Sequence, residues 1–171
     1  MSHCYIEFVP KDEKSLRRTS ELFAMLKVAK DADEALDDSR FVDYFTETER
    51  AYFWSPSTEE QREWNNEWFS TPIEIRHSPK MLTPQWHLES MLDAFSNGDY
   101  QLIAIQDKNG KYQLAFNPHG YPYGGTGCMV AFLECFGHSI VGIEDGTGYE
   151  KYTPQTKFWK SKQKNRWQFW R

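Results

Sequence analysis

The sequence predicts an α+β fold, with one domain built from an antiparallel sheet, a central buried helix and flanking helices. The sheet is indicated by residues 101–117, where two β-rich runs flank Asn109-Gly110, the preferred pair for a type I′ hairpin turn. The buried helix is indicated by Cys128–Phe136, a run with a single charged residue. Apolar residues at helical spacing, in residues 13–36 and after Thr83-Pro84, predict the flanking helices.

The composition fits one domain with a substantial core. Phe, Tyr and Trp supply 28 of the 171 residues, and each buried aromatic side chain removes roughly 150–250 Å² of surface from water. No window of about 18 apolar residues predicts a membrane span. The N-terminus lacks the basic and apolar regions of a signal peptide. Together with three cysteines that lack metal-site spacing, these features predict a cytoplasmic protein that does not enter a membrane.

The first predicted elements are a strand and a helix. Apolar and polar residues alternate over Cys4–Val9, which favours an edge strand. Asp12 follows Pro10 and can cap a helix that covers residues 13 to about 36, as one helix or as two short ones.

The middle of the chain carries a second helix signal. Ser57 and Glu60 have the spacing of a capping box. Trp64 and Trp68 follow four residues apart, so they share one face of the predicted helix. The next residues, 71–75, are predicted to form a short strand.

Three signals complete the C-terminal half. Thr83-Pro84 matches a helix start, and Asn97-Gly98 ends that helix. Gly137 fits a left-handed C-cap after the buried helix. Residues 139–143 then read as a strand.

Charge divides the chain into two parts. Residues 151–171 contain seven Lys or Arg and no acid, while residues 1–150 carry a formal net charge of −12. The acids are densest in Asp31–Glu49, which has eight carboxylates and one Arg. We therefore expect a single acidic α+β domain at 1–150 and a basic aromatic segment at 151–171 that packs on it.

A Gly-rich turn before the buried helix raises two functional alternatives. Backbone N–H groups at a helix start can bind an anion, which makes a ligand-binding loop of Gly124, Gly125, Thr126 and Gly127. Alternatively, Cys128 is a catalytic nucleophile in the first helical turn, with His119 or His138 as its base.

A third interpretation, in which these residues only form a tight turn before the buried helix, is favoured over both functional alternatives. The spacing matches neither a P-loop nor GxGxxG. Cys128 also begins an apolar run, and burial there raises a thiol pKa. The sequence thus favours a protein without catalytic residues, and an enzyme or ligand-binding domain using residues 119–128 is the alternative.

No cofactor or metal is expected. His77 and His87 are isolated, and no HExxH or paired spacing occurs. The C-terminal segment interleaves Lys and Arg with Phe and Trp, a composition that can hold single-stranded nucleic acid. This second alternative is disfavoured, because the acidic remainder of the chain repels phosphate.

The stretch Asn117–Gly137, together with the acidic composition and the chain length, resembles small cytosolic immunity proteins of bacterial toxin–immunity systems. The resemblance lies within residues 99–149. Members of this class are often single α+β domains without catalytic motifs. The resemblance implies a protein that binds and neutralises a cognate, secreted toxin, and it assigns no site residues.

An acidic surface with exposed aromatic residues suits such a partner, because charge steers a basic protein and aromatic side chains supply binding hot spots. The predicted partner-binding face consists of the acidic segment and two tryptophans: Asp31, Asp33, Glu34, Asp37, Asp38, Asp43, Glu47, Glu49, Trp64 and Trp68.

Overall fold

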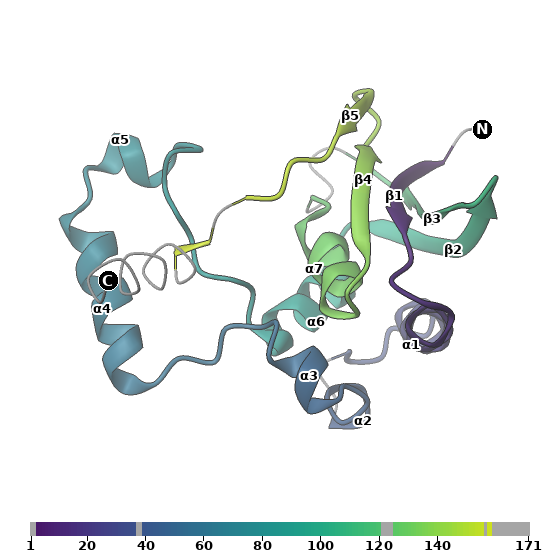
Figure 1. Cartoon of the computed structure of the whole chain (residues 1–171), viewed down its shortest axis with the longest axis horizontal. Helices are drawn as coiled ribbons and strands as arrows, with labels where there is room; N and C mark the ends of the chain where they lie inside the picture. The colour runs from purple at the N-terminus through teal and green to yellow at the C-terminus, as the bar shows by residue number, and fades with distance from the viewer. Residues whose placement is uncertain (1–2, 37–38, 121–124, 156, 159–171) are drawn as a thin grey trace, which may run out of the picture. The chain divides into compact units, whose positions relative to one another are not determined.

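The computed structural model describes residues 3–36, 39–120, 125–155 and 157–158. It divides into two compact units (Figure 1). The first unit comprises residues 1–53 and 86–153 and contains the sheet. The second comprises residues 54–85 and the described residues after Thr153. Helices beside a five-stranded antiparallel sheet confirm the α+β class.

The sheet has the strand order β2-β3-β1-β4-β5, and every neighbouring pair is antiparallel. β1 therefore lies in the middle of the sheet, so its assignment as an edge strand is wrong. The alternation of apolar and polar residues indicates only that one face of the strand is buried. Central and edge strands of an antiparallel sheet both show this alternation, so it does not distinguish them. The strands are β1 Cys4–Val9, β2 Tyr100–Lys108, β3 Lys111–Pro118, β4 Ser139–Glu144 and β5 Tyr149–Lys151.

The predicted hairpin is confirmed. Asn109 and Gly110 have φ of 58° and 84°, as a type I′ turn requires at both central positions. Lys108 pairs with Lys111 directly across this turn. A register shift between Leu102 and Ala104 puts one bulged residue into β2.

Three helices of the first unit carry most of its core: α1 Glu13–Asp31, α6 Leu88–Asn97 and α7 Gly127–Cys135. α7 is buried nearly all round, as its sequence predicts. The Phe132 ring meets Phe95 and Phe136 edge-on, with centroids 5.4 and 5.5 Å apart. Gly137 follows α7 with a φ of 86°.

α6 begins four residues later than its Thr83-Pro84 signal predicts. A helix starting there would use the Thr83 carbonyl for its first hydrogen bond, but that carbonyl accepts the Phe158 N–H at 3.0 Å. His87 is the actual N-cap residue, and its side chain makes no capping bond.

The second unit contains α4 Thr58–Ser70 and α5 Ile73–Arg76. The Ser57–Glu60 capping box of α4 is confirmed. α5 replaces the predicted strand, because Pro72 stands at its start, where a missing N–H costs no helical bond.

Two short helices, α2 Ser39–Val42 and α3 Glu47–Arg50, follow α1 in the first unit. Thr46 and Glu49 form a second capping box at the start of α3. Among the helices in the described residues, none combines the length and apolar character that crossing a membrane needs.

Candidate functional site

The Gly-rich turn is explained in part by packing. Gly125 has a φ of 77°, a conformation that favours glycine. Gly127 lies against the Trp86 indole, and an added Cβ would stand 3.3 Å from its Cζ2 atom. Thr126 precedes α7 without a side-chain capping bond. Gly124, the fourth predicted loop residue, lies outside the described residues.

The candidate nucleophile Cys128 is buried, with 2% of its surface exposed. Burial raises its thiol pKa, and Sγ lies 3.2 Å from the Tyr100 hydroxyl. His119 is exposed just after β3, whereas His138 lies beyond the C-terminal end of α7, and Cys128 stands at the start of that helix. The hydrogen-bond partner of the Cys128 thiol is thus Tyr100, and the His138 ring bonds to Lys11 and Thr19.

Native labelling of the cysteines should therefore be slow. We expect Cys128 and Cys135 to react with a thiol reagent at least about a hundredfold more slowly in the folded protein than in urea, because only the exposed thiolate reacts. Mass spectrometry of alkylated peptides gives the rate at each site. Rapid labelling of Cys128 in the folded chain would instead support its alternative role as a catalytic nucleophile.

His138 belongs to a buried structural network. Its Nδ1 accepts the Lys11 backbone N–H at 3.2 Å, which leaves the ring proton on Nε2. Nε2 lies 2.8 Å from the Thr19 hydroxyl, and that hydroxyl donates onward to the Ser15 carbonyl. Burial lowers the pKa of His138 to about 4. At neutral pH the imidazole is thus uncharged and links α1 to the turn before β4.

The predicted acidic face divides into exposed and buried members. Asp31, Asp33, Glu34, Asp43 and Glu47 are exposed. Asp37 and Asp38 lie outside the described residues.

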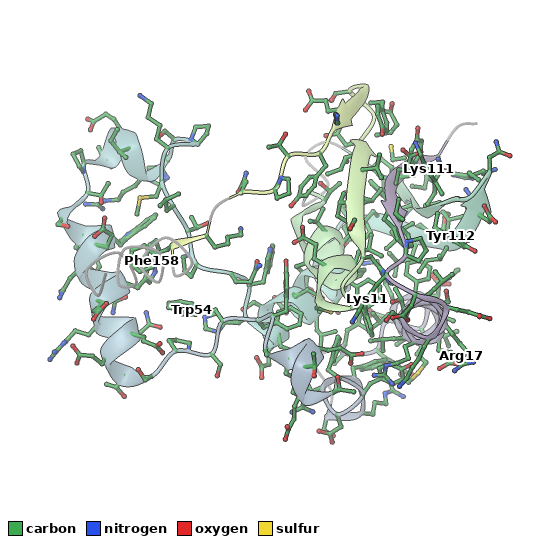
Figure 2. All side chains as sticks on the ribbon, viewed as in Figure 1. Lys11, Arg17, Trp54, Lys111, Tyr112 and Phe158 are labelled. Carbon is green, nitrogen blue, oxygen red and sulfur yellow. The ribbon has the colours of Figure 1, made fainter. Side chains whose placement is uncertain are left out.

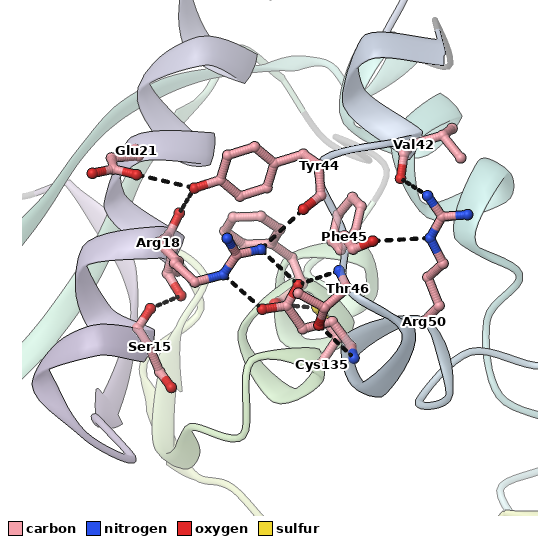
Figure 3. Close-up of polar contacts among 12 residues, drawn as sticks. Ser15, Arg18, Glu21, Val42, Tyr44, Phe45, Thr46, Arg50 and Cys135 are labelled. Carbon is pink, nitrogen blue, oxygen red and sulfur yellow. Dashed lines mark hydrogen bonds and ion pairs between the residues drawn. The ribbon is translucent and has the colours of Figure 1, made fainter.

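Glu49, in contrast, is only 9% exposed and does not offer its charge to a partner. Its two carboxylate oxygens accept hydrogen bonds from Arg18, both at 2.9 Å (Figure 3). The Thr46 N–H donates to the same carboxylate at 2.8 Å. Arg18 also donates to the Tyr44 carbonyl, so this cluster joins α1 to the segment before α3. Glu49 therefore has a structural role.

The two predicted tryptophans lie in the second unit, whereas the acidic segment belongs to the first. Their rings are 5.8 Å apart on α4, which confirms that they share a face. Trp64 also packs against Trp54 and Phe158, with ring centroids 6.4 and 5.0 Å apart. Trp54 and Phe158 are labelled in Figure 2. These contacts make Trp64 a packing residue of its own unit, and they do not join the tryptophans to the acidic segment.

Sequence reasoning missed an open apolar groove of about 380 Å³ on the outer side of α1. Met25 and Val28 stand at its surface, 40% and 69% exposed. A signal was present, because apolar residues at 24, 25, 28 and 32 run beside the buried stripe at 22, 23, 26 and 29. α1 therefore carries more apolar surface than its own core covers. The groove is lined by Ala24, Met25, Val28, Ala29, Glu34, Arg40 and Phe41.

Carboxylates border this groove. Glu34 forms an ion pair with Arg40, whose guanidinium lies over the Phe41 ring at 4.5 Å. Asp31 and Asp33 flank the end of α1, and Asp33 is held in a left-handed turn with a φ of 58°. Lys27 pairs with Asp31 at 2.5 Å, so that carboxylate is also compensated, whereas the Lys30 ammonium donates to three carbonyls at the end of α6. The result is an apolar surface whose edge carries two ion pairs and one further carboxylate, that of Asp33.

In the part of the chain that the structure describes, no three His, Cys, Asp or Glu side chains are grouped to hold a metal ion. Comparison of the chain with protein-family models, curated proteins and solved structures gave no match.

Proposed function

We propose that this chain is a non-enzymatic binding protein for a basic protein partner, and that the partner is a bacterial toxin which it neutralises. The observation that carries the proposal is the exposed apolar groove of α1 beside the acidic segment. Contiguous exposed apolar surface edged by polar residues is typical of interaction sites. Opposite charge around such a surface speeds association and selects the partner.

The toxin assignment is supported by the resemblance of Asn117–Gly137 to immunity proteins and by the placement of the catalytic candidates. Cys128 is buried with its Sγ against the Tyr100 hydroxyl, and the His138 ring bonds to Lys11 and Thr19. An immunity protein needs a binding surface and no reacting groups, which agrees with both observations.

The charge contribution can be measured with a triple variant, Asp33→Asn, Asp43→Asn and Glu47→Gln. All three carboxylates are exposed. The probe is the purified product of the gene immediately upstream, with association and dissociation rates measured at two salt concentrations. We expect association at low salt to slow about fivefold or more while dissociation changes little. The effect should shrink at high salt, because exposed charges are screened beyond about 8–10 Å.

A matched triple variant of the second unit controls for net charge: Glu59→Gln, Glu67→Gln and Glu74→Gln, all exposed. It removes the same charge from other elements and should slow association less. Equal slowing by both variants would show that net charge, rather than this face, steers the partner. An upstream product that is neither toxic nor bound by this chain would overturn the immunity assignment.

A further inference from the structure

We infer that the groove of α1 receives an amphipathic helix of the partner, with Lys or Arg along its flanks. This inference rests on the proposed function, because it specifies which kind of partner segment occupies the same surface. It concerns the groove-lining residues Ala24, Met25, Val28, Ala29 and Phe41 and the acids Asp31, Asp33 and Glu34.

The first argument is the spacing of the exposed side chains. Met25, Val28 and Ala32 are exposed at intervals of three and four residues, so they form a ridge along about two turns of α1. Ridges at this spacing pack into the grooves of a facing helix at axis separations of about 8–10 Å. Met25 adds an adaptable side chain, which suits the irregular surface of an incoming helix.

An extended strand does not fit this surface. A peptide that adds to a protein as a strand needs free backbone N–H and C=O groups along a sheet edge. The groove is built on the helix α1, whose interior backbone groups are bonded within the helix. A partner can therefore bind this surface only through side-chain packing. A helix can do so, because its own backbone groups are already hydrogen-bonded within it.

A small molecule fits poorly as well. Ligand pockets enclose most of the ligand and place a few polar groups to orient it. Here Val28 is 69% exposed, and the lining Glu34 and Arg40 already pair with each other. An open groove of this kind suits an occupant with a broad apolar face of its own.

A second copy of this chain is disfavoured by charge. Asp31 pairs with Lys27 and Glu34 with Arg40, so the edge carries the Asp33 carboxylate in excess. A two-fold contact through the groove would bring this excess negative charge of both copies together, and like charges in an interface oppose binding. Lys or Arg beside the apolar side of an incoming helix would instead meet the Asp33 carboxylate and offset this excess charge. The occupant is therefore basic as well as amphipathic.

Three synthetic 18-residue peptides test this form of recognition. One carries Leu at helical spacing and Lys elsewhere. The second has the same composition with Leu at every second position where possible, and the third replaces Lys by Glu in the helical pattern. Fluorescence anisotropy measures the affinity of each for the full chain, for Val28→Glu and for the control Ile73→Glu. Ile73 is similarly exposed, at 60%, but lies in the second unit.

We expect the helical Leu/Lys peptide to bind the wild type and Ile73→Glu alike, and Val28→Glu about tenfold or more weakly. The added carboxylate of Val28→Glu attracts Lys, so a loss of affinity there must come from apolar contact. The other two peptides should bind the wild type at least about tenfold more weakly. Because both substitutions are at exposed positions, matching thermal unfolding curves should show that the variants fold.

Unchanged binding by Val28→Glu, or equal binding of the alternating peptide, overturns the helix inference. If the acidic triple variant still slows the partner in that case, the proposed function stands with a different occupant. If the helical peptide behaves as expected while the upstream product does not bind, the groove recognises basic helices and the toxin assignment fails.

Discussion

Replacing Glu49 by alanine is expected to lower the free energy of unfolding by about 3 kcal/mol. The substitution removes both hydrogen bonds to Arg18 and the one from the Thr46 N–H. It leaves a half-buried guanidinium without its carboxylate. The value lies at the low end for a broken buried pair, because the side chains of Arg18 and Glu49 are 24% and 12% exposed.

Glu47→Ala is the matched control, because Glu47 is an exposed acid on the same short helix. We expect it to change stability by no more than about 0.5 kcal/mol. Urea unfolding of both variants at neutral pH gives the comparison. Similar stability losses would show that the Arg18–Glu49 cluster does not hold α1 to the segment before α3.

Acid should destabilise the protein through His138. Burial lowers the pKa of this residue from 6.5 to about 4, so the folded state prefers the neutral ring. Its contribution to stability is fully present above about pH 6.5 and is lost as the pH falls towards 4. A proton on Nδ1 would face the Lys11 N–H, which is itself a donor. We expect His138 to account for a loss of roughly 2–3 kcal/mol between pH 7.5 and 4.5.

His138→Gln isolates this effect, because an amide keeps a donor and an acceptor but does not titrate. Urea unfolding at both pH values, for the wild type and the variant, separates the histidine from the carboxylates, which titrate in both proteins. Lys11 and Asp12 are the charged groups that act on the ring, and both remain in the variant. Equal acid sensitivity of the two proteins would mean that His138 is not held neutral by the fold.

Much of the fold follows from local signals. The Asn109-Gly110 turn, the Ser57–Glu60 capping box and the apolar block of α7 each specify their own conformation, and the structure has all three. Features that involve residues far apart in the sequence were harder to predict. The predicted start of α6 at Thr83-Pro84 is not used, and the Thr83 carbonyl accepts instead from Phe158, 75 residues further along the chain.

The candidate site was predicted only in part, for the same reason. Composition identified the acidic segment, but counting carboxylates could not show that Glu49 is paired with Arg18, a residue on another helix. Helical spacing predicted α1, but the second apolar stripe at residues 24, 25, 28 and 32 was not recognised. Spacing also does not show which apolar residues of a helix its neighbours cover, so the exposure of Met25 and Val28 became visible only in the folded chain.

The central claim is that the outer face of α1 and the acids beside it form the partner-binding surface. Backbone amide NMR of the isotopically labelled chain, with and without the purified upstream product, tests it most directly. We predict the largest chemical-shift changes in residues 21–36 and 39–43, around the groove. Changes concentrated in residues 107–112 of the hairpin or 54–85 of the second unit, with 21–43 unaffected, would contradict the claim.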